Sequence, residues 1–249
     1  MSLTLGLGAA VSGMAYHQTV LDVVGQNLAN ADTHAFRRSR ILAEGNPRPG
    51  LSPEQNRLGV AEITVDRVFT VGAAQLSESP LHFAINDDSF FRVRDFDGTT
   101  VLTRFGGIGL GEGGNIAAFG GRLLEPPIRI PAGQQNLAID AEGIITGIDA
   151  NSEKQTYGQL TLVRVMNPSG LEGIGEGLYR ETVNSGAVSE GRPGSASFAT
   201  LISGALEGSN TDAAQEFTQI IVAQRAYQAA ARTFGVGDEM LKLATNITQ

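Results

Sequence analysis

Two groups of residues in this sequence are of types that could do chemistry. Asp87 and Asp88 are adjacent carboxylates, the groups that general acid–base catalysis uses. They stand where a turn is expected, and aspartate favours turns because its side chain bonds to nearby backbone groups, so we interpret them as turn residues. The histidines, His17, His34 and His82, have no second ligand at the helical spacing that would place two metal ligands on one face. The sequence therefore predicts no catalytic residue and no metal site.

A glycine-rich run from Gly109 to Gly114 matches the letters of a dinucleotide-binding loop. Such a loop must lie between a strand and a helix, so that the pyrophosphate meets the helix N-terminus. The sequence that follows, NIAAFGGRLLEPPI, does not favour a helix, and we interpret the run as a hairpin. There is no Gly-x-Ser-x-Gly motif and no cysteine, which excludes thiol catalysis and cysteine zinc sites. We predict that the protein is not an enzyme and binds neither a cofactor nor a small-molecule substrate.

Charge and hydropathy narrow the remaining classes. The formal net charge of -8 argues against general binding of nucleic acid or anionic membranes, which both attract basic surfaces. No apolar run reaches the roughly 18 residues of a membrane span, so we expect a chain that is not membrane-inserted. The first residues, MSLTLGLGAA, lack the basic region of a signal peptide, and any export is expected to occur without a cleaved signal. Arg37, Arg38 and Arg40 form a basic cluster that is either a solvated face or a contact with an acidic neighbour.

The elements that would position these residues differ between the ends and the middle of the chain. Near the start, apolar residues recur at alternating steps of three and four, which indicates a helix packed along another helix. Their positions are Leu7, Ala10, Met14, His17, Leu21, Val24 and Leu28. A second series near the end has the same spacing, and an acidic first turn precedes it at Ser209–Asp212. Its positions are Phe217, Ile220, Gln224, Tyr227, Ala231 and Phe234, and Leu241 continues it.

Between the two helices the period changes to two. In LHFAI, residues 81–85, Leu81, Phe83 and Ile85 share one face, and paired turn residues recur along the chain. The sequence contains 32 glycines, which suits short strands joined by tight turns. We therefore predict a mixed α and β fold: long terminal helices in an antiparallel coiled-coil-like pair, with a central all-β domain of hairpins.

The predicted division has three parts. Residues 1–35 together with 208–249 form the helical domain, residues 36–62 an extended connector, and residues 63–207 the central domain. The connector includes Pro47, Pro49 and Pro53, and proline fixes φ near -65°. We expect this segment to lie against neighbouring subunits and to stiffen an assembly.

The end of the first helix is unusually polar, with Asn27, Asn30, Asp32 and Thr33 close together. Short polar side chains bond to nearby backbone groups, so we expect these residues to end the helix and turn the chain outward. Phe36 would then anchor the exit.

The two ends of the chain resemble the bacterial flagellar rod and hook proteins. SGMAYHQTVLDVVGQNLANADTHAFRR, residues 12–38, is similar to the family's N-terminal signature, and LEGSNTDAAQEFTQIIVAQRAYQ, residues 206–228, to its C-terminal helix. FAINDDSFFRV and the segment around NPSGLEGIGEGLY resemble internal family segments, the latter most like the distal-rod members. Two positions depart from the pattern: Ala35 stands where the family has glycine, and Asp87-Asp88-Ser89 replaces a glycine-containing turn.

The resemblance implies a structural subunit of the flagellar rod in the basal body, spanning the periplasm and exported by the flagellar type III apparatus. Terminal helices would form an inner tube, with copies of this chain and other rod and hook subunits as partners. Within the family the alternative is a proximal rod or short hook subunit; outside it, a β-rich binding or adhesion protein with a helical oligomerisation stalk. The expected subunit-interface residues are Leu7, Met14, Leu21, Val24, Asn27, Leu28, Asn30, Phe36, Phe217, Ile220, Gln224, Arg225, Tyr227, Phe234 and Leu241.

Overall fold

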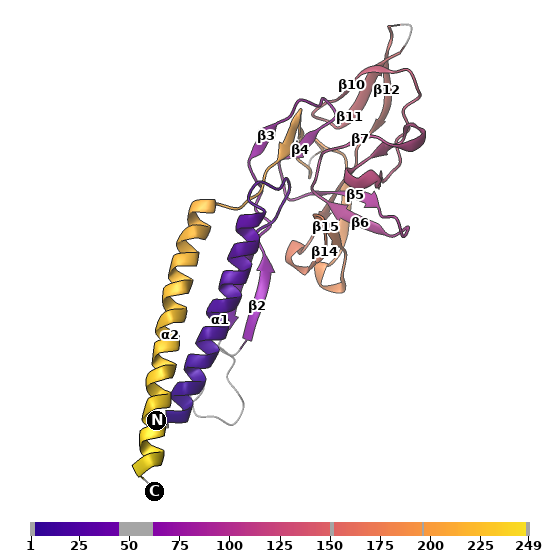
Figure 1. Cartoon of the computed structure of the whole chain (residues 1–249). Helices are drawn as coiled ribbons and strands as arrows, with labels where there is room; N and C mark the ends of the chain where they lie inside the picture. Colours follow the sequence, from indigo (N-terminus) through magenta and orange to yellow (C-terminus); the bar gives the residue numbers. More distant parts are fainter. Residues whose placement is uncertain (1–2, 45–61, 150–151, 196, 248–249) are drawn as a thin grey trace. The chain divides into compact units, whose positions relative to one another are not determined.

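The computed structural model describes residues 3–44, 62–149, 152–195 and 197–247. The chain forms two compact units, which we call the helical unit and the central unit (Figure 1). The helical unit takes Met1–Ala31, Arg38–Val68 and Thr211–Gln249, and the central unit takes Asp32–Arg37 and Phe69–Asn210. The chain therefore passes from one unit to the other four times.

The helical unit is built on two long helices, α1 (Leu3–Ala29) and α2 (Ala213–Ile247). Asp212 caps α2, because its Oδ1 accepts the backbone N–H of Ala214 at 2.9 Å and of Gln215 at 3.3 Å. The first helix closes where the Asn30 N–H donates to Asn27 O at 3.2 Å.

The two helices run in opposite directions and pack through small residues. Ala10 on α1 and Ala223 on α2 are buried. A Cβ added to Gly237 would lie 2.5 Å from Leu7 Cδ2, so the helices approach closely where a side chain is absent. By contrast Phe217, the first residue of the apolar series predicted for the second helix, is 54% exposed. The fold-class prediction of a coiled-coil-like pair is therefore wrong, because alanine and glycine line much of the contact and Phe217, a large residue of the predicted series, lies in solvent.

A two-stranded antiparallel sheet belongs to the same unit. It consists of β1 (Ser39–Glu44) and β2 (Glu62–Arg67), with Ser39 opposite Arg67. Arg40 and Asp66 form an ion pair across it at 2.9 Å. Residues 45–61, and with them the three connector prolines and the stiffening role predicted for them, lie outside the described residues.

The central unit is almost entirely strands and turns (Figure 1). Its largest sheet has 9 strands, and smaller sheets flank it. Short 3-10 turns occur at Glu112–Gly114, Phe119–Gly121, Pro168–Gly170 and Val183–Ser185. The strands are β3 (Ala74–Leu76), β4 (Phe83–Ile85), β5 (Phe90–Arg94), β6 (Thr100–Thr103), β7 (Gly109–Leu110), β8 (Ile116–Ala117), β9 (Leu123–Leu124), β10 (Gln135–Ile139), β11 (Ile144–Ile148), β12 (Lys154–Gln159), β13 (Leu162–Val165), β14 (Glu172–Gly175), β15 (Leu178–Arg180), β16 (Val188–Gly191), β17 (Leu201–Ser203) and β18 (Ala205–Glu207).

Hairpins do not account for this unit. β5–β6 and β10–β11–β12 are local pairs, but β17 pairs with β4 and β18 pairs with β3, across more than a hundred residues of chain. The prediction of a central domain of hairpins is wrong for this reason. Alternation of side chains along one strand reports burial but not which distant strand lies beside it.

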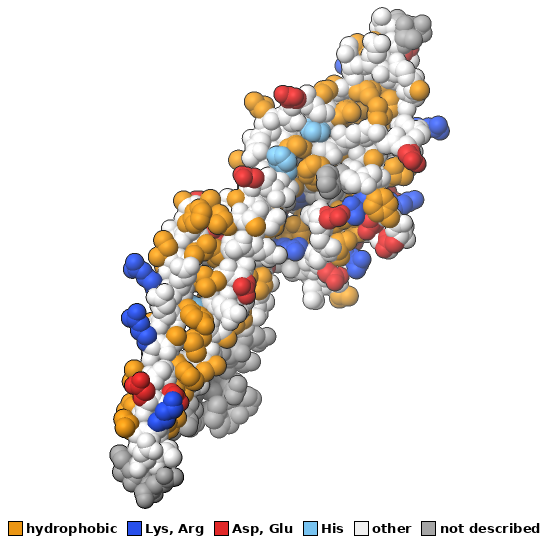
Figure 2. All heavy atoms as spheres, in the orientation of Figure 1, with side chains coloured by type: hydrophobic (Ala, Val, Ile, Leu, Met, Phe, Trp, Pro, Cys, Tyr) orange, Lys and Arg blue, Asp and Glu red, His pale blue; other side chains and the backbone are white. Residues whose placement is uncertain are grey.

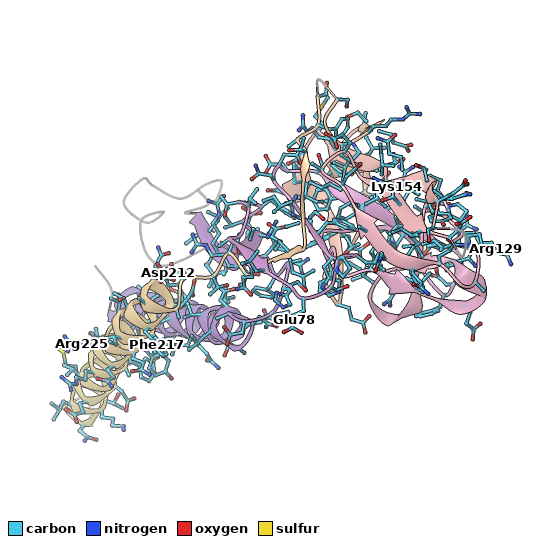
Figure 3. All side chains as sticks on the ribbon, turned by 90° about the horizontal axis from the view of Figure 1, so that it is seen from above. Glu78, Arg129, Lys154, Asp212, Phe217 and Arg225 are labelled. Atoms are coloured by element: carbon cyan, nitrogen blue, oxygen red, sulfur yellow. The ribbon has the colours of Figure 1, made fainter. Side chains whose placement is uncertain are left out.

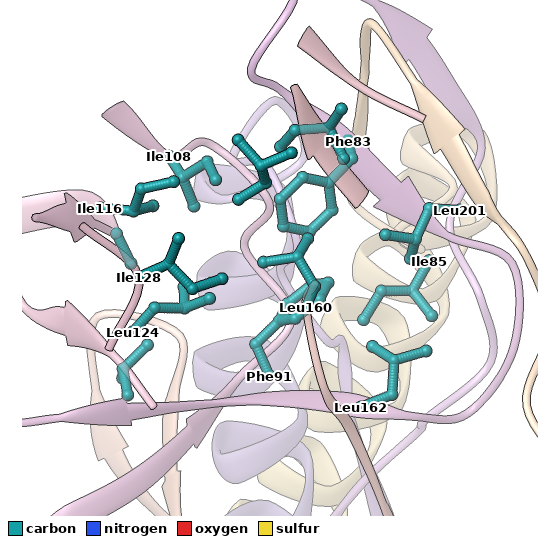
Figure 4. Packing of buried hydrophobic residues seen from close by; sticks show 14 of the residues in the cluster. Phe83, Ile85, Phe91, Ile108, Ile116, Leu124, Ile128, Leu160, Leu162 and Leu201 are labelled. Atoms are coloured by element: carbon teal, nitrogen blue, oxygen red, sulfur yellow. The ribbon is translucent and has the colours of Figure 1, made fainter. Parts of the chain in front are cut away.

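The core of the central unit gathers large apolar side chains from many strands. Phe83, Phe91, Leu160 and Leu162 meet there, together with isoleucines such as Ile116 (Figure 4). The rings of Phe83 and Phe91 pack edge to face with centroids 4.5 Å apart. All three residues of β4 are buried, so this strand is covered on both faces rather than on the one that its alternation predicts.

Candidate functional site

Asp87 and the glycine-rich run, which we considered as catalytic and nucleotide-binding candidates, belong to the fold of the central unit. The carboxylate of Asp87 accepts the backbone N–H of Ser89 at 2.9 Å and of Ala199 at 3.0 Å, and pairs with Arg164 at 2.8 Å. The glycine-rich run at residues 109–114 forms β7 and a single 3-10 turn, so it does not lead into the helix that a dinucleotide loop requires. Within the described ranges, no three His, Cys, Asp or Glu side chains are grouped to hold a metal ion.

Asn27 connects three elements of the helical unit. Its amide Oδ1 accepts the Ser39 N–H at 2.8 Å, and its Nδ2 donates to Ser39 O at 2.8 Å. The same Nδ2 donates to Glu216 Oε2, on α2, at 3.3 Å. Asn27 lies inside α1 and pairs with the start of β1 as a neighbouring strand would, so its expected role in ending the helix is wrong. That role belongs to the residues after Ala29.

Glu216, which accepts this bond from Asn27, is fully buried in the first turn of α2. Arg38 lies 3.6 Å from its Oε1, which supplies a cation beside the buried carboxylate. The basic cluster of the sequence is therefore divided. Arg38 meets Glu216, Arg40 meets Asp66, and Arg37 belongs to the central unit.

In the central unit the two terminal motifs meet at Glu207, the glutamate of LEGSN. Arg37 Nη2 donates to Glu207 Oε1 at 2.5 Å, and Arg104 Nε donates to Glu207 Oε2 at 2.9 Å. All three side chains are buried. Burial lowers the pKa of Arg37, and repulsion from Arg104 adds to this effect. Next to this cluster, the Asn210 N–H donates to Phe36 O at 3.4 Å, so Phe36 lies where the two motifs join.

The predicted interface residues divide by exposure, and their role in an interface stays a prediction. Val24 and Asn27 are buried within the helical unit. Half-buried side chains are those of Leu7, Met14, Leu21, Leu28, Asn30, Phe36, Ile220 and Leu241. Exposed side chains are those of Phe217, Gln224, Arg225, Tyr227 and Phe234.

Helix α2 exposes more apolar surface than the predicted series contains. Figure 3 labels Asp212, which caps this helix, and Phe217 and Arg225, which belong to its first half. Hydrophobic side chains cover much of the visible face of the two long helices in Figure 2. Ile221, which widens the apolar stripe of the sequence, is exposed too. Exposed side chains of α2 that the sequence pattern missed are Val222, Val236, Met240 and Leu243. No described helix is long and apolar enough to cross a membrane.

Sequence reasoning missed the buried acids that organise the site, Glu207 and Glu216, and the cation Arg104. Glu207 was visible in the LEGSN motif, and Glu216 four residues after the helix cap. Nothing local marks Arg104, because its partner lies 103 residues away along the chain.

Family models match two parts of the chain. Residues 202–247 match the model described as "Flagellar basal body rod FlgEFG protein C-terminal", which includes β18 and α2. Residues 84–147 match "Flagellar hook protein FlgE/F/G D1 domain", which lies in the central unit.

Curated relatives cover nearly the whole chain. The flagellar basal-body rod protein FlgG of Bacillus subtilis is 35% identical over 97% of this chain and 98% of its own length. FlgG of Caulobacter vibrioides is 33% identical over 97% and 98%. The flagellar hook protein FlgE of Borreliella burgdorferi is 41% identical, but over 43% of this chain and 24% of its own. The sequence resemblance is thereby confirmed: the chain belongs to the flagellar basal-body rod protein family and is a structural subunit of the flagellar rod.

Proposed function

We propose that this rod subunit polymerises with copies of itself into a helical tube that transmits torque. The observation that carries the proposal is the exposed apolar surface of α2. Phe217, Ile221 and Val222 are each more than half exposed at its start, and Val236, Met240 and Leu243 at its end. A soluble monomer rarely leaves so much apolar surface in water, and such patches mark interaction sites.

The geometry of α2 supports an open polymer rather than a closed dimer. One face of the helix packs on α1 through Ala223 and Gly237, while apolar side chains project in other directions around its axis. Contacts between unlike faces repeat from copy to copy, and they give a helix when the rotation does not close. We propose that the exposed members of the predicted interface, from Phe217 to Phe234, contact the neighbouring copy directly. Val24 and Asn27, buried within one copy, hold the helices in the arrangement that presents this face.

The matches support a rod subunit over a hook subunit. The rod relatives correspond to this chain from end to end, whereas the hook relative is matched over about a quarter of its length. We propose a place in the distal, periplasm-spanning part of the rod, next to other rod and hook subunits. This finer placement rests on the resemblance of the segment around Asn167–Tyr179.

Electron microscopy of the concentrated, purified chain tests the polymer. Tubes or helical filaments are expected from the wild type and not from Phe217→Asp, because a carboxylate in an apolar contact is strongly unfavourable. Phe96→Asp is the matched control, since Phe96 is an exposed aromatic that belongs to the central unit and not to α2. Discrete bundles from the wild type, or normal filaments from Phe217→Asp, would overturn the proposal.

A further inference from the structure

Three segments carry the chain into and out of the central unit, and they are hydrogen-bonded to one another. They are residues 32–37, 69–73 and 207–210, which we call the collar. The Ala35 N–H donates to Glu207 O at 2.8 Å, which joins the first segment to the third. The Gly208 N–H donates to Ala73 O at 2.8 Å, which joins the second to the third. The collar thus gathers all the points at which the described chain enters or leaves this unit.

The segments approach one another as closely as backbones can. A Cβ added to Gly72 would lie 2.1 Å from Gly208 O, a distance that no side chain tolerates. The amide of Asn210 reaches the second segment, where its Nδ2 donates to Thr70 O at 3.1 Å. This packing leaves no room for water between the second and third segments at Gly72, so the groups there must satisfy one another.

Glu207 contributes a side chain that contacts every part of this arrangement. Its Oε1 accepts from Arg37 of the first segment and, at 2.8 Å, from the N–H of Gly72 in the second. Its Oε2 accepts from Arg104, which follows β6 in the body of the central unit. One carboxylate therefore bonds to two segments of the collar and to the sheet behind them, and it belongs itself to the third segment.

Charge makes this carboxylate hard to replace. Arg37 and Arg104 are both buried, and both guanidinium groups meet the same acid. Arg104 is further held by Ser89 O, which accepts from its Nη1 at 2.5 Å, and by the ring of Phe90, 5.6 Å from its Cζ. Removing the negative charge would leave two like charges facing each other in a medium of low dielectric constant. Arg104 is fixed to the sheet, so Arg37 and its segment are the part that can move away.

We propose that Glu207 is a positioning residue that locks each of the three segments of the collar to the sheet, so that loss of its negative charge frees all of them together. In an assembled rod, a load on the terminal helices would then enter the central unit at one point. This second statement rests on the proposed function, whereas the first concerns the isolated chain.

Amide hydrogen exchange of the full-length monomer tests the lock. In Glu207→Gln the amides of Ala35, Gly72 and Gly208 are expected to exchange roughly tenfold faster or more, all by a similar factor. Amides of β5, Phe90–Arg94, keep their wild-type rates, because the core of the sheet does not depend on the collar. The matched control is Glu125→Gln, which removes the acid of an exposed ion pair with Arg94 and is expected to leave the collar unchanged.

Arg37→Met separates locking from general stability, because it leaves Glu207 and Arg104 as a balanced pair. It is expected to speed exchange at Ala35 and to spare Gly72. In the double variant Arg37→Met with Glu207→Gln, exchange at Ala35 should not exceed that of Glu207→Gln alone, since both changes break the same contact. Equal acceleration in β5 and the collar, acceleration at Gly72 alone, or additive effects at Ala35 would each overturn the lock.

Polymers of Glu207→Gln test the load statement, which is the proposal that a load on the terminal helices enters the central unit at one point. They are expected to form, because the face of α2 is unchanged, and to bend more than wild-type polymers in electron micrographs. Equal stiffness with an opened collar in the monomer would overturn the load statement and leave the lock intact. Failure of the wild type to polymerise would instead overturn the proposed function, and the two failures are thus distinguishable.

Discussion

The helical unit and the central unit differ in which side chains form their internal contacts. The central unit buries large apolar side chains: Phe83, Phe91 and Leu160 are at most 1% exposed. The helical unit places alanine and glycine in its contact and leaves Phe217 and Val222 in solvent. The central unit forms an apolar core within one copy of the chain. The helical unit holds its helices together through small residues and leaves several large apolar side chains of α2 exposed.

In their buried polar groups, by contrast, the two units are alike. Each unit has a buried acid that fixes a terminal motif: Glu216 holds Asn27 in the helical unit, and Glu207 holds Arg37 in the central unit. Asn27 and Arg37 both belong to the N-terminal signature, and each bonds to the buried acid of a different unit. In this chain both terminal motifs therefore make intramolecular contacts.

Truncating a phenylalanine in each unit gives the largest contrast. Phe91→Ala should lower the free energy of unfolding of the central unit by about 3–5 kcal/mol, through lost burial and the cavity left behind. Phe217→Ala should change monomer stability by no more than about 0.5 kcal/mol, since its ring is already in solvent. Urea denaturation followed by circular dichroism checks both.

The effects of the two variants on polymerisation should be the reverse of their effects on stability. Phe217→Ala would weaken polymerisation, while any folded Phe91→Ala would polymerise normally. A large stability loss for Phe217→Ala would mean that this ring packs within its own chain, and the comparison between the units would then fail.

Asn27 gives the next largest effect, confined to the helical unit. Asn27→Ala should cost about 1–3 kcal/mol there, because it leaves the Ser39 backbone and Glu216 without their buried partner. Asn30→Ala is the matched control, since the amide of Asn30 makes an exposed bond to Gln26 O and its loss should cost less than about 0.5 kcal/mol. Exchange of the Ser39 amide measures the difference. Equal effects of the two variants would show that the bonds of Asn27 do not fix β1.

Acid should test the central unit through Asp87, with a smaller effect. Burial acts to raise the pKa of this carboxyl, but hydrogen bonds from Ala199 and Ser89 and the charge of Arg164 outweigh it and hold the pKa below its ordinary 3.8. A lowered pKa stabilises the fold above the ordinary value, and this contribution is lost as pH falls through the lower value. Asp87→Asn should therefore cost about 1–2 kcal/mol at neutral pH and converge with the wild type well below pH 3.8.

The measurement is thermal unfolding across that range of pH. Asp88→Asn serves as the control, because it removes the neighbouring carboxylate and leaves the hydrogen bonds from Ser89 and Ala199 to Asp87 in place. A constant difference between Asp87→Asn and the wild type at every pH would show that the charge of Asp87 is not what stabilises the turn.

Local signals explain what the sequence could predict. The long helices were predicted from period, and the family from the two terminal motifs. Which face of α2 packs was not predictable, because alanine and glycine carry no strong hydrophobic signal, whereas Phe217 and Tyr227 do. The pairing of β18 with β3 and of β17 with β4, and the contact of Arg104 with Glu207, depend on residues more than a hundred positions apart, which no local pattern reports.

The smallest expected effect concerns Ala35, where the N-terminal signature that this chain resembles led us to expect glycine. Its φ is +58°, in the left-handed region, and its methyl group is buried. Ala35→Gly loses that burial, about 0.8 kcal/mol, and adds chain entropy to the unfolded state, about 0.5–1 kcal/mol. It also relieves the left-handed strain of about 1–2 kcal/mol. The terms nearly cancel, so a change within about 0.5 kcal/mol is expected in urea denaturation.

Ala84→Gly is the control that isolates the strain. Ala84 is equally buried but lies in strand β4, so its replacement has the same two costs and no relief. The difference between the two variants, expected to be about 1–2 kcal/mol in favour of Ala35→Gly, measures the strain energy of alanine in the left-handed conformation. Equal losses would mean that Ala35 is unstrained and that alanine holds this turn without an energetic penalty.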